Sequence, residues 1–473
     1  MSTFSGLNTA YTGLVAARQG LDVVGQNLAN ANTEGYTRQR VNTSAIGPVA
    51  STGLFSAGVT PGQGVSVDSI TRLGDSFLDA RVRTAGSASG YWNARSDGMG
   101  TLETSLNEPG ANGISTQLQS FWSAWQVLSN NVDKPATAGV LLQQAGALTA
   151  QIAQGYRAVS DQWKETRGKV DALTTQVNTA ATQIAELNGR IRSTVAAGGS
   201  VNEMLDQRTQ LTTSLSALVG GTVRDVGDGT VEVLVAGNAL VSGDKARTIV
   251  AIGSSELAGV AGSPVHLEWQ DLPGKAIALD GGAIAGNISL LAPTNGGTGG
   301  ALAEAAQSYN DFAEQLAEAV NAVHNTGVTQ TGAAGGDFFG FTGGLPAALG
   351  LTVIPTIADG IATGAAGAGG YDGSIADAIA QIGMAANSPD KAWSTIVTRI
   401  GVAAKTDAQQ AALAGIASTN ATSMQLANAS VDTDEENMNM ITFQHAYQGA
   451  ARMMTAVDEM LDTLINHTGL VGR

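Results

Sequence analysis

The sequence predicts a mainly α-helical fold with inserted β structure. Helices at the two ends of the chain are expected to form a coiled-coil layer, next to a helical bundle domain and Gly-rich, β-rich outer units. Three observations support this prediction. Apolar residues near both ends recur at alternating spacings of three and four. The same spacing returns in several internal segments, and after residue 220 it gives way to alternation of apolar and polar residues.

Residues 1–40 are predicted to form the N-terminal helix and a following turn. Tyr11 and four leucines that repeat every seven residues form the predicted seam: Leu7, Leu14, Leu21 and Leu28. The helix is expected to stop within residues 30–36, which contain Asn and Gly. These residue types tolerate the left-handed conformation with which a chain often leaves a helix.

Residues 431–473 are predicted to form the C-terminal helix. Just before the seam, residues 433–436 (Thr-Asp-Glu-Glu) fit a capping box, with carboxylates where the helix N-terminus is positive. The seam itself repeats without a break, and its larger members are Met440, Phe443, Tyr447, Met454, Val457, Leu461 and Leu464.

The middle of the chain is predicted to be nested. A helical domain is expected to be assembled from three separate stretches, with two β-type units inserted between them. The helical stretches are residues 41–219, 296–329 (a returning helix) and 374–430. The inserted units are a β-rich outer domain at 220–295 and a Gly-rich insertion at 330–373.

Composition and charge exclude several classes of protein. The chain has 473 residues and no cysteine, which rules out disulfides and Cys-ligated metal centres. Its 24 basic and 40 acidic residues give a net charge of −16, which argues against nucleic acid as a partner. Charged residues are 14% of the chain, against about 25% on average. The first residues lack a cationic region followed by an apolar run, so no signal peptide is expected, and no apolar window is long enough for a membrane helix.

The search for catalytic or ligand-binding motifs finds none. Gly168-Lys169 and Gly274-Lys275 lack the Ser or Thr of a phosphate-binding loop. Residues 432–437 lack the Gly that a calcium loop requires at its sixth position. None of the four histidines belongs to a His-Glu-x-x-His pair. We therefore predict no catalytic, cofactor-binding or metal-binding residues, and a protein that is not an enzyme.

The terminal seams allow two interpretations. They could pack within one chain as an ordinary helical bundle. Alternatively, two helices rich in Ala, Gly, Asn and Thr bury too little apolar surface to offset the entropy of ordering them, and neighbouring copies complete their packing. The second interpretation predicts terminal helices that become ordered on assembly.

Motifs along nearly the whole chain resemble those of bacterial flagellar rod, hook and hook-associated proteins. Residues 27–39 (Asn-Leu-Ala-Asn-Ala-Asn-Thr-Glu-Gly-Tyr-Thr-Arg-Gln) look like the signature that follows the first helix of this family. Glu34 stands where the family usually has Pro, so the turn is expected to be softer. Further similar segments occur in the family's order: 205–211, 319–324, 337–339, 430–437 and 443–448. The combination points to the hook-associated proteins that join the hook to the filament.

The resemblance implies a structural role without turnover. Such proteins self-assemble into a ring between hook and filament, with the terminal helices in an axial coiled-coil layer. Their partners are other copies, the hook protein, the neighbouring junction protein and an export chaperone. They reach the cell exterior through the flagellar type III apparatus and need no cofactor. Neither nucleic acid nor membrane insertion is expected. The alternatives are another flagellar axial protein, namely the second junction protein or the hook protein, and an extracellular adhesin.

The resemblance also implies roles for individual residues. The turn below the inner helix would be shaped by Asn27, Asn30, Asn32, Gly35 and Tyr36. The two predicted seams would bury the contacts of the inner layer.

Overall fold

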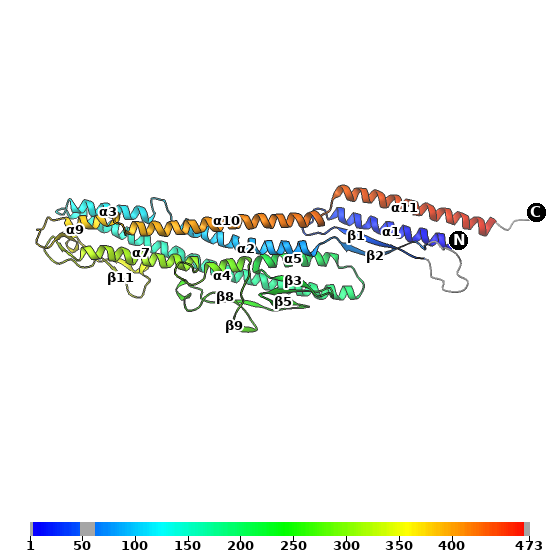
Figure 1. Ribbon diagram of the computed structural model, residues 1–473, viewed down its shortest axis with the longest axis horizontal. Coiled ribbons are helices and arrows are strands. Elements are labelled where there is room, and N and C mark those ends of the chain that lie inside the picture. Colours follow the sequence, from blue (N-terminus) through cyan, green and yellow to red (C-terminus); the bar gives the residue numbers. More distant parts are fainter. Residues whose placement is uncertain (1–2, 48–61, 468–473) are drawn as a thin grey trace, which may run out of the picture.

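The computed structural model describes residues 3–47 and 62–467 and shows an elongated molecule with helices parallel to its long axis (Figure 1). At one end, the first and last helices, α1 (Thr3–Ala29) and α11 (Thr433–Asp462), lie side by side. The hairpin of β1 (Gln39–Ala45) and β2 (Val65–Arg72) packs against α1. We call α1, α11 and this hairpin the arm, and the elements from α2 to α10 the rod.

The rod is a bundle of long helices around an apolar core. Its longest helix, α4, has 62 residues and spans about 93 Å at 1.5 Å per residue. Four fully buried residues of α4 repeat every seven positions, Val170, Val177, Ile184 and Ile191, as the predicted helical spacing requires. The helices of the rod are α2 (Ser76–Ser105), α3 (Ile114–Ser129), α4 (Pro135–Ala196), α5 (Asn202–Val219), α6 (Gly282–Leu290), α7 (Ala301–His324), α8 (Ala347–Gly350), α9 (Ser374–Ala380) and α10 (Pro389–Ala429).

The first β unit packs on α4. It holds a four-stranded antiparallel sheet in the order β3-β4-β5-β6 and a three-stranded sheet in the order β7-β8-β9. Two Asn side chains of α4 anchor the sheets: Asn188 donates to the Val231 carbonyl and Asn178 to the Ile249 carbonyl, each at 2.8 Å. The strands are β3 (Thr222–Asp225), β4 (Val231–Val235), β5 (Asn238–Ser242), β6 (Lys245–Ala246), β7 (Ile249–Ile252), β8 (His266–Trp269) and β9 (Leu272–Ala276).

The second β unit lies at the end of the rod away from the arm (Figure 1). It consists of two short antiparallel pairs, β10 with β13 and β11 with β12. Their neighbour Phe338 is buried against Phe121 and Trp125 of α3, which explains the aromatic residues of both segments. The strands are β10 (Gly327–Thr329), β11 (Phe339–Phe341), β12 (Leu351–Val353) and β13 (Ala362–Ala365).

The predicted fold class, helical with inserted β structure, is confirmed. Two features were not predicted from the sequence: the β1–β2 hairpin and the helix α6 inside the 220–295 segment. The hairpin is polar and uneven in its alternation, with a register shift between Asn42 and Thr43, so it has a weak sequence pattern. In the part of the chain that the structure describes, no helix combines the length and apolar character needed to cross a bilayer.

Candidate functional site

The two helices of the arm pack antiparallel through glycine. Gly6, Gly13 and Gly20 repeat every seven residues along α1 and face Val457, Ala450 and Phe443 of α11. We call these three glycines the glycine seam. A Cβ at Gly20 would stand 2.5 Å from the Phe443 ring, closer than real Cβ contacts allow. The missing side chains let the helices approach closely, as small residues do at tight helix–helix contacts.

The leucines predicted to form the N-terminal seam lie one position further along the same heptad. Leu7, Leu14, Leu21 and Leu28, which we call the leucine stripe, are half-buried on the flank of the arm, and Tyr11 is 55% exposed. Within one chain, therefore, the stripe stays partly exposed, while the glycine seam faces α11. It also lies roughly opposite Thr12, whose hydroxyl accepts from the Val65 N–H at 3.3 Å and marks the side of α1 that faces the hairpin.

The predicted C-terminal seam agrees better with the contact between α1 and α11 than the predicted N-terminal seam does. Phe443 and Val457 contact the glycine seam, and Met454 and Leu461 are half-buried. Three other predicted members, Met440, Tyr447 and Leu464, are exposed within the single chain. Within the single chain, therefore, only part of the predicted C-terminal seam is covered by α1.

The signature turn follows α1 and bears on the rod. Tyr36 N–H donates to the Thr33 carbonyl at 3.2 Å, and Gly35, with φ of 78°, supplies the left-handed conformation at the third position. A Cβ on Gly35 would meet the Gln210 side chain at 2.1 Å, so both backbone and space require glycine. Gln210 Nε2 holds the Glu34 carbonyl at 2.8 Å, which secures the turn although Glu replaces Pro.

Asn27 is the centre of the contacts between α1, the turn and α11. Its side chain is 1% exposed and makes four hydrogen bonds. Nδ2 donates to the Gln39 carbonyl at 2.9 Å and to Glu436 Oε2 at 3.1 Å. Oδ1 accepts from the Tyr36 hydroxyl at 2.8 Å and from the Gln39 N–H at 3.0 Å. An Asn amide has no capacity beyond these four bonds, so only this residue type satisfies the position.

Glu436 joins the same network from α11. It is 1% exposed, and its Oε1 lies 2.6 Å from Arg38 Nη2 and 2.8 Å from Arg38 Nε. Glu435, which is exposed, pairs with Arg38 Nη1 at 2.8 Å, and this bond is the main cause of the raised pKa of Arg38. The predicted capping box at 433–436 is wrong by one position: Asp432 is the N-cap and accepts from the N–H groups of residues 434 and 435. Glu436 instead reaches across to α1.

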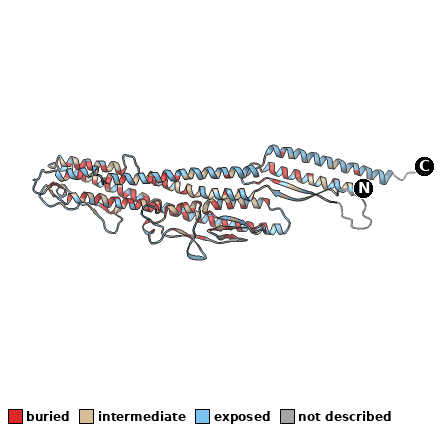
Figure 2. Ribbon diagram, viewed as in Figure 1, coloured by how far each residue is buried: buried red, intermediate tan, exposed pale blue. Residues whose placement is uncertain are grey.

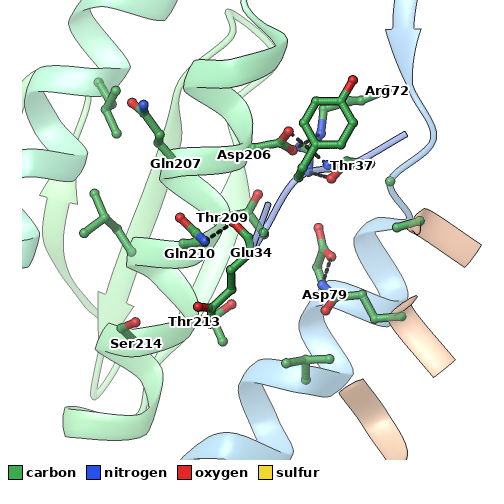
Figure 3. Close-up of a pocket in the computed structure, with 18 of the residues that line it drawn as sticks. Glu34, Thr37, Arg72, Asp79, Asp206, Gln207, Thr209, Gln210, Thr213 and Ser214 are labelled. Carbon is green, nitrogen blue, oxygen red and sulfur yellow. Dashed lines mark hydrogen bonds and ion pairs between the residues drawn. The ribbon is translucent and has the colours of Figure 1, made fainter. Parts of the chain in front are cut away.

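A second group of contacts fixes the turn to α5 and β2. Asp206 Oδ2 accepts from the Thr37 N–H at 3.1 Å, and Asp206 Oδ1 lies 3.0 Å from Arg72 Nε (Figure 3). Burial raises the pKa of the Asp206 carboxyl, and the charge of Arg72 opposes that rise. Burial, with Asp206 nearby, also raises the pKa of Tyr36 to about 12. A pocket of about 890 Å³ opens beside these residues, between the turn, α4, α5 and α10.

The network spans residues that are far apart in the chain. We call it the joint; it consists of Asn27, Tyr36, Arg38, Asp206 and Glu436 with their partners. Asn27, Gly35 and Tyr36 were predicted to shape the turn, and the structure brings them together. Asn30 bonds back into its own helix, and Asn32 is exposed.

Arg38, Asp206 and Glu436 were not among the predicted site residues. Each lies inside a segment that resembles the flagellar family, and that was the available signal. Asp206 belongs to residues 205–211 and Glu436 to residues 430–437. Asp206 and Glu436 are set apart because they are acidic residues of helices that are buried instead of facing solvent, whereas Arg38 lies between α1 and β1.

The joint is suited to mechanical coupling rather than to chemistry. Asn27, Arg38 and Glu436 are linked by hydrogen bonds, and a polar network of this kind holds elements in one relative geometry. Within residues 3–47 and 62–467, no group of three or more His, Asp or Glu side chains is arranged to hold a metal ion.

Family models match three parts of the chain. The model of the helical domain of flagellar hook-associated protein FlgK matches residues 99–339, just over half of the chain. The chain belongs to the FlgK family. Two further models cover the arm of this FlgK-family chain. A flagella basal body rod protein model matches residues 7–37, and the C-terminal model of the basal body rod FlgEFG proteins matches residues 425–467.

Individual relatives extend the match. Flagellar hook-associated protein 1 of Bacillus subtilis is 29% identical over the whole of both chains. The protein of that name from Escherichia coli is 32% identical over 72% of this chain and 61% of its own length. In fold, the chain is similar to the flagellar hook junction protein FlgK of Burkholderia pseudomallei, with a TM-score of 0.62 and 16% identity. That match covers 76% of this chain and all of the other.

Proposed function

We propose that this FlgK-family chain is a structural protein of the junction between the flagellar hook and filament, and that it assembles with copies of itself through the arm. One observation carries the proposal: the arm is matched by models of flagellar axial proteins at both ends of the chain, while the rod matches the FlgK helical domain. The match to the FlgK helical domain favours the junction protein over another flagellar axial protein. An adhesin would need no paired terminal helices of this kind.

The half-buried leucine stripe supports assembly through the arm. α1 and α11 pack against each other through the glycine seam. The leucine stripe is left on a flank of the arm, where neighbouring copies can cover it. Full burial of an exposed Leu contributes about 1.5–3 kcal/mol, and because these four leucines are already half-buried, completing their burial contributes part of that value at each position. On this view the arm is paired within one chain, and copies around it complete the packing.

The proposal includes the cellular route and the partners. The chain would contact the hook protein on one side and the neighbouring junction protein on the other. It would leave the cell through the flagellar type III apparatus with a dedicated chaperone and would act without catalysis. The seven sequence segments from residues 1–40 to 431–473 remain the proposed domain division, with the arm helices at its two ends.

Gene deletion followed by complementation tests the function. Cells without the gene should carry hooks without filaments and release flagellin into the medium. Leu14→Asp, on the leucine stripe, should fail to restore filaments. The matched control Asn8→Asp, at an exposed position of the same helix, should restore them. Normal filaments in the deletion strain would refute the junction role, and full rescue by Leu14→Asp would refute assembly through the leucine stripe.

A further inference from the structure

The half of α10 that adjoins the arm is exposed but carries no charge. Residues 408–431 contain no Asp, Glu, Lys, Arg or His, and the segment is bounded by Asp407 and Asp432. Solvated helix surfaces normally carry roughly 25–35% charged residues. The exposed face of α4 fits that norm, with exposed Lys164 and Asp171 among its residues. A neutral exposed helix of this length is typical of a surface that becomes covered.

Three exposed large apolar side chains of this stretch share one face: Leu413 (61%), Ile416 (58%) and Met424. Val402, which is 61% exposed, continues their row on the other side of Lys405 and Asp407. At 100° per residue they fall within an arc of about 80°, so they form one row. We call this row the α10 stripe. Figure 2 shows the exposed colour along this half of α10 and on into α11.

The opposite face of α10 is already occupied. Ile400, Ala404 and Ala421 are buried, and Asp407 pairs with Arg95 of α2 at 2.9 Å. The packing against α2 therefore fixes which way α10 faces. The α10 stripe is presented outward by a rigid pair of helices, not by a loose segment.

We propose that the α10 stripe is a contact surface for the rod of a second copy of this chain in the assembled junction. This inference rests on the proposed self-assembly and adds a contact of the rod to that of the arm. Charge argues for a second copy as the occupant. Two chains of net charge −16 repel each other except where their facing surfaces lack carboxylates. The α10 stripe is such a surface.

A second uncharged stretch lies in the arm. Residues 437–451 of α11 contain no Asp, Glu, Lys or Arg. Between the two neutral stretches, the carboxylates of Glu435 and Glu436 are paired with Arg38. Asp432 and Asp434 also lie between the two stretches and are exposed, so the uncharged surfaces of α10 and α11 are two separate areas.

The size of the stripe explains why it acts only together with the arm. It spans 23 residues, from Val402 to Met424, or about 33 Å of helix, and at a helix diameter of about 10 Å it covers roughly 300 Å². A stable interface buries about 800 Å² on each partner. The stripe alone is too small to hold two copies together, so the isolated chain should stay monomeric and copies should meet through it once their arms have assembled.

Site-specific photo-crosslinking in flagellated cells tests the proposal. A photoreactive residue at Leu413 should give an adduct with the mass of two chains that contains only this protein. The same residue at exposed Glu314 of α7 should not give it, and a third probe at Tyr11 reports on the arm. An adduct at Tyr11 but none at Leu413 would overturn the α10 stripe and leave the proposed function standing. No self-adduct at any site would count against self-assembly itself, and an adduct of Leu413 with a different protein would also overturn the stripe.

A charge variant gives an independent measurement. Leu413→Asp with Ile416→Asp should leave the melting temperature of the purified monomer unchanged and reduce the number of filaments per cell at least tenfold. The control pair Gln176→Asp and Thr179→Asp has the same spacing on an exposed face of α4 and should leave filaments unaffected. Normal filament numbers in the α10 variant would overturn the proposal. A melting temperature that falls in that variant would do so as well, since the two side chains would then be part of the monomer's own packing.

Discussion

Glu436 is predicted to lock the arm to the signature turn, and Glu436→Gln tests this directly. Its two carboxylate oxygens accept from different donors, Oε2 from Asn27 and Oε1 from Arg38. Glutamine has a single side-chain oxygen. One of the two donors would therefore lose its partner and face an NH₂ group at a position that is 1% exposed.

The magnitude follows from that geometry. Leaving a buried donor unsatisfied costs about 1–3 kcal/mol, and loss of a charged partner places the effect in the upper half of that range. A cost of about 2–3 kcal/mol corresponds to a change of roughly 30- to 150-fold in an opening equilibrium. The rod should be unaffected, because the described contacts of Glu436 lie in the arm and the turn.

Backbone hydrogen–deuterium exchange measures the opening of the arm separately from the rod. Amides in the last turns of α1 and the first turns of α11 should exchange roughly 30- to 150-fold faster in Glu436→Gln, and those in the middle of α4 should not change. Glu435→Gln is the matched control: it removes a carboxylate that pairs with the same Arg38 but is exposed, so a change under about fivefold is expected. Equal effects of the two variants, or an effect of Glu436→Gln below threefold, would refute the reasoning.

Three further outcomes are expected. Gly20→Ala should destabilise the α1–α11 contact by about 1–3 kcal/mol, because its Cβ meets the Phe443 ring. Gly25→Ala, with open space around it, should stabilise α1 by up to about 1 kcal/mol. If hydrogen exchange showed that both variants stabilise the arm, the glycine seam would be contradicted. Asn27→Asp should place a carboxylate against Glu436 and weaken the arm at pH 7, with partial recovery near pH 4, where carboxylates take up protons; equal exchange at the two pH values would argue against that contact. Burial lowers the pKa of His324 from its usual 6.5, so below about pH 6.5 the unfolded chain binds more protons than the folded chain and stability is lost. The difference between the urea midpoints at pH 7.5 and 5.5 should therefore be smaller in His324→Gln than in the unmodified chain. An unchanged difference would show that His324 is not the cause of the pH dependence.

Much of the rod could be predicted from the sequence because its helices bury large side chains at regular spacing. In α4, Val170, Val177, Ile184 and Ile191 alternate with polar residues over a length that only a helix accommodates. The β-rich unit was predicted in the same way, from the alternation that buries Val231, Val233 and Val235 of β4. Periodic burial of large apolar groups is a local property, so it is visible in the order of residues.

The arm shows where this reasoning stops. The leucine stripe has the stronger apolar pattern, yet the glycine seam makes the intramolecular contact. Glycine has no side chain to mark it as buried, and its role depends on what stands opposite, such as Phe443 against Gly20. Sequence periodicity located the helices of the arm, whereas the structure shows that Gly6, Gly13 and Gly20 face α11. The role of the leucine stripe in assembly stays a prediction.

The sequence by itself determined the helical class, the inserted β units and the resemblance that names the family, because each depends on residues that are neighbours or at fixed spacing. The tertiary structure alone decided the joint. Glu436 and Asn27 are 409 positions apart, and Thr37 and Asp206 are 169 apart. Their polar groups need one another only because folding has taken them out of water, and burial of that kind arises from the assembled elements and not from the order of residues along the chain.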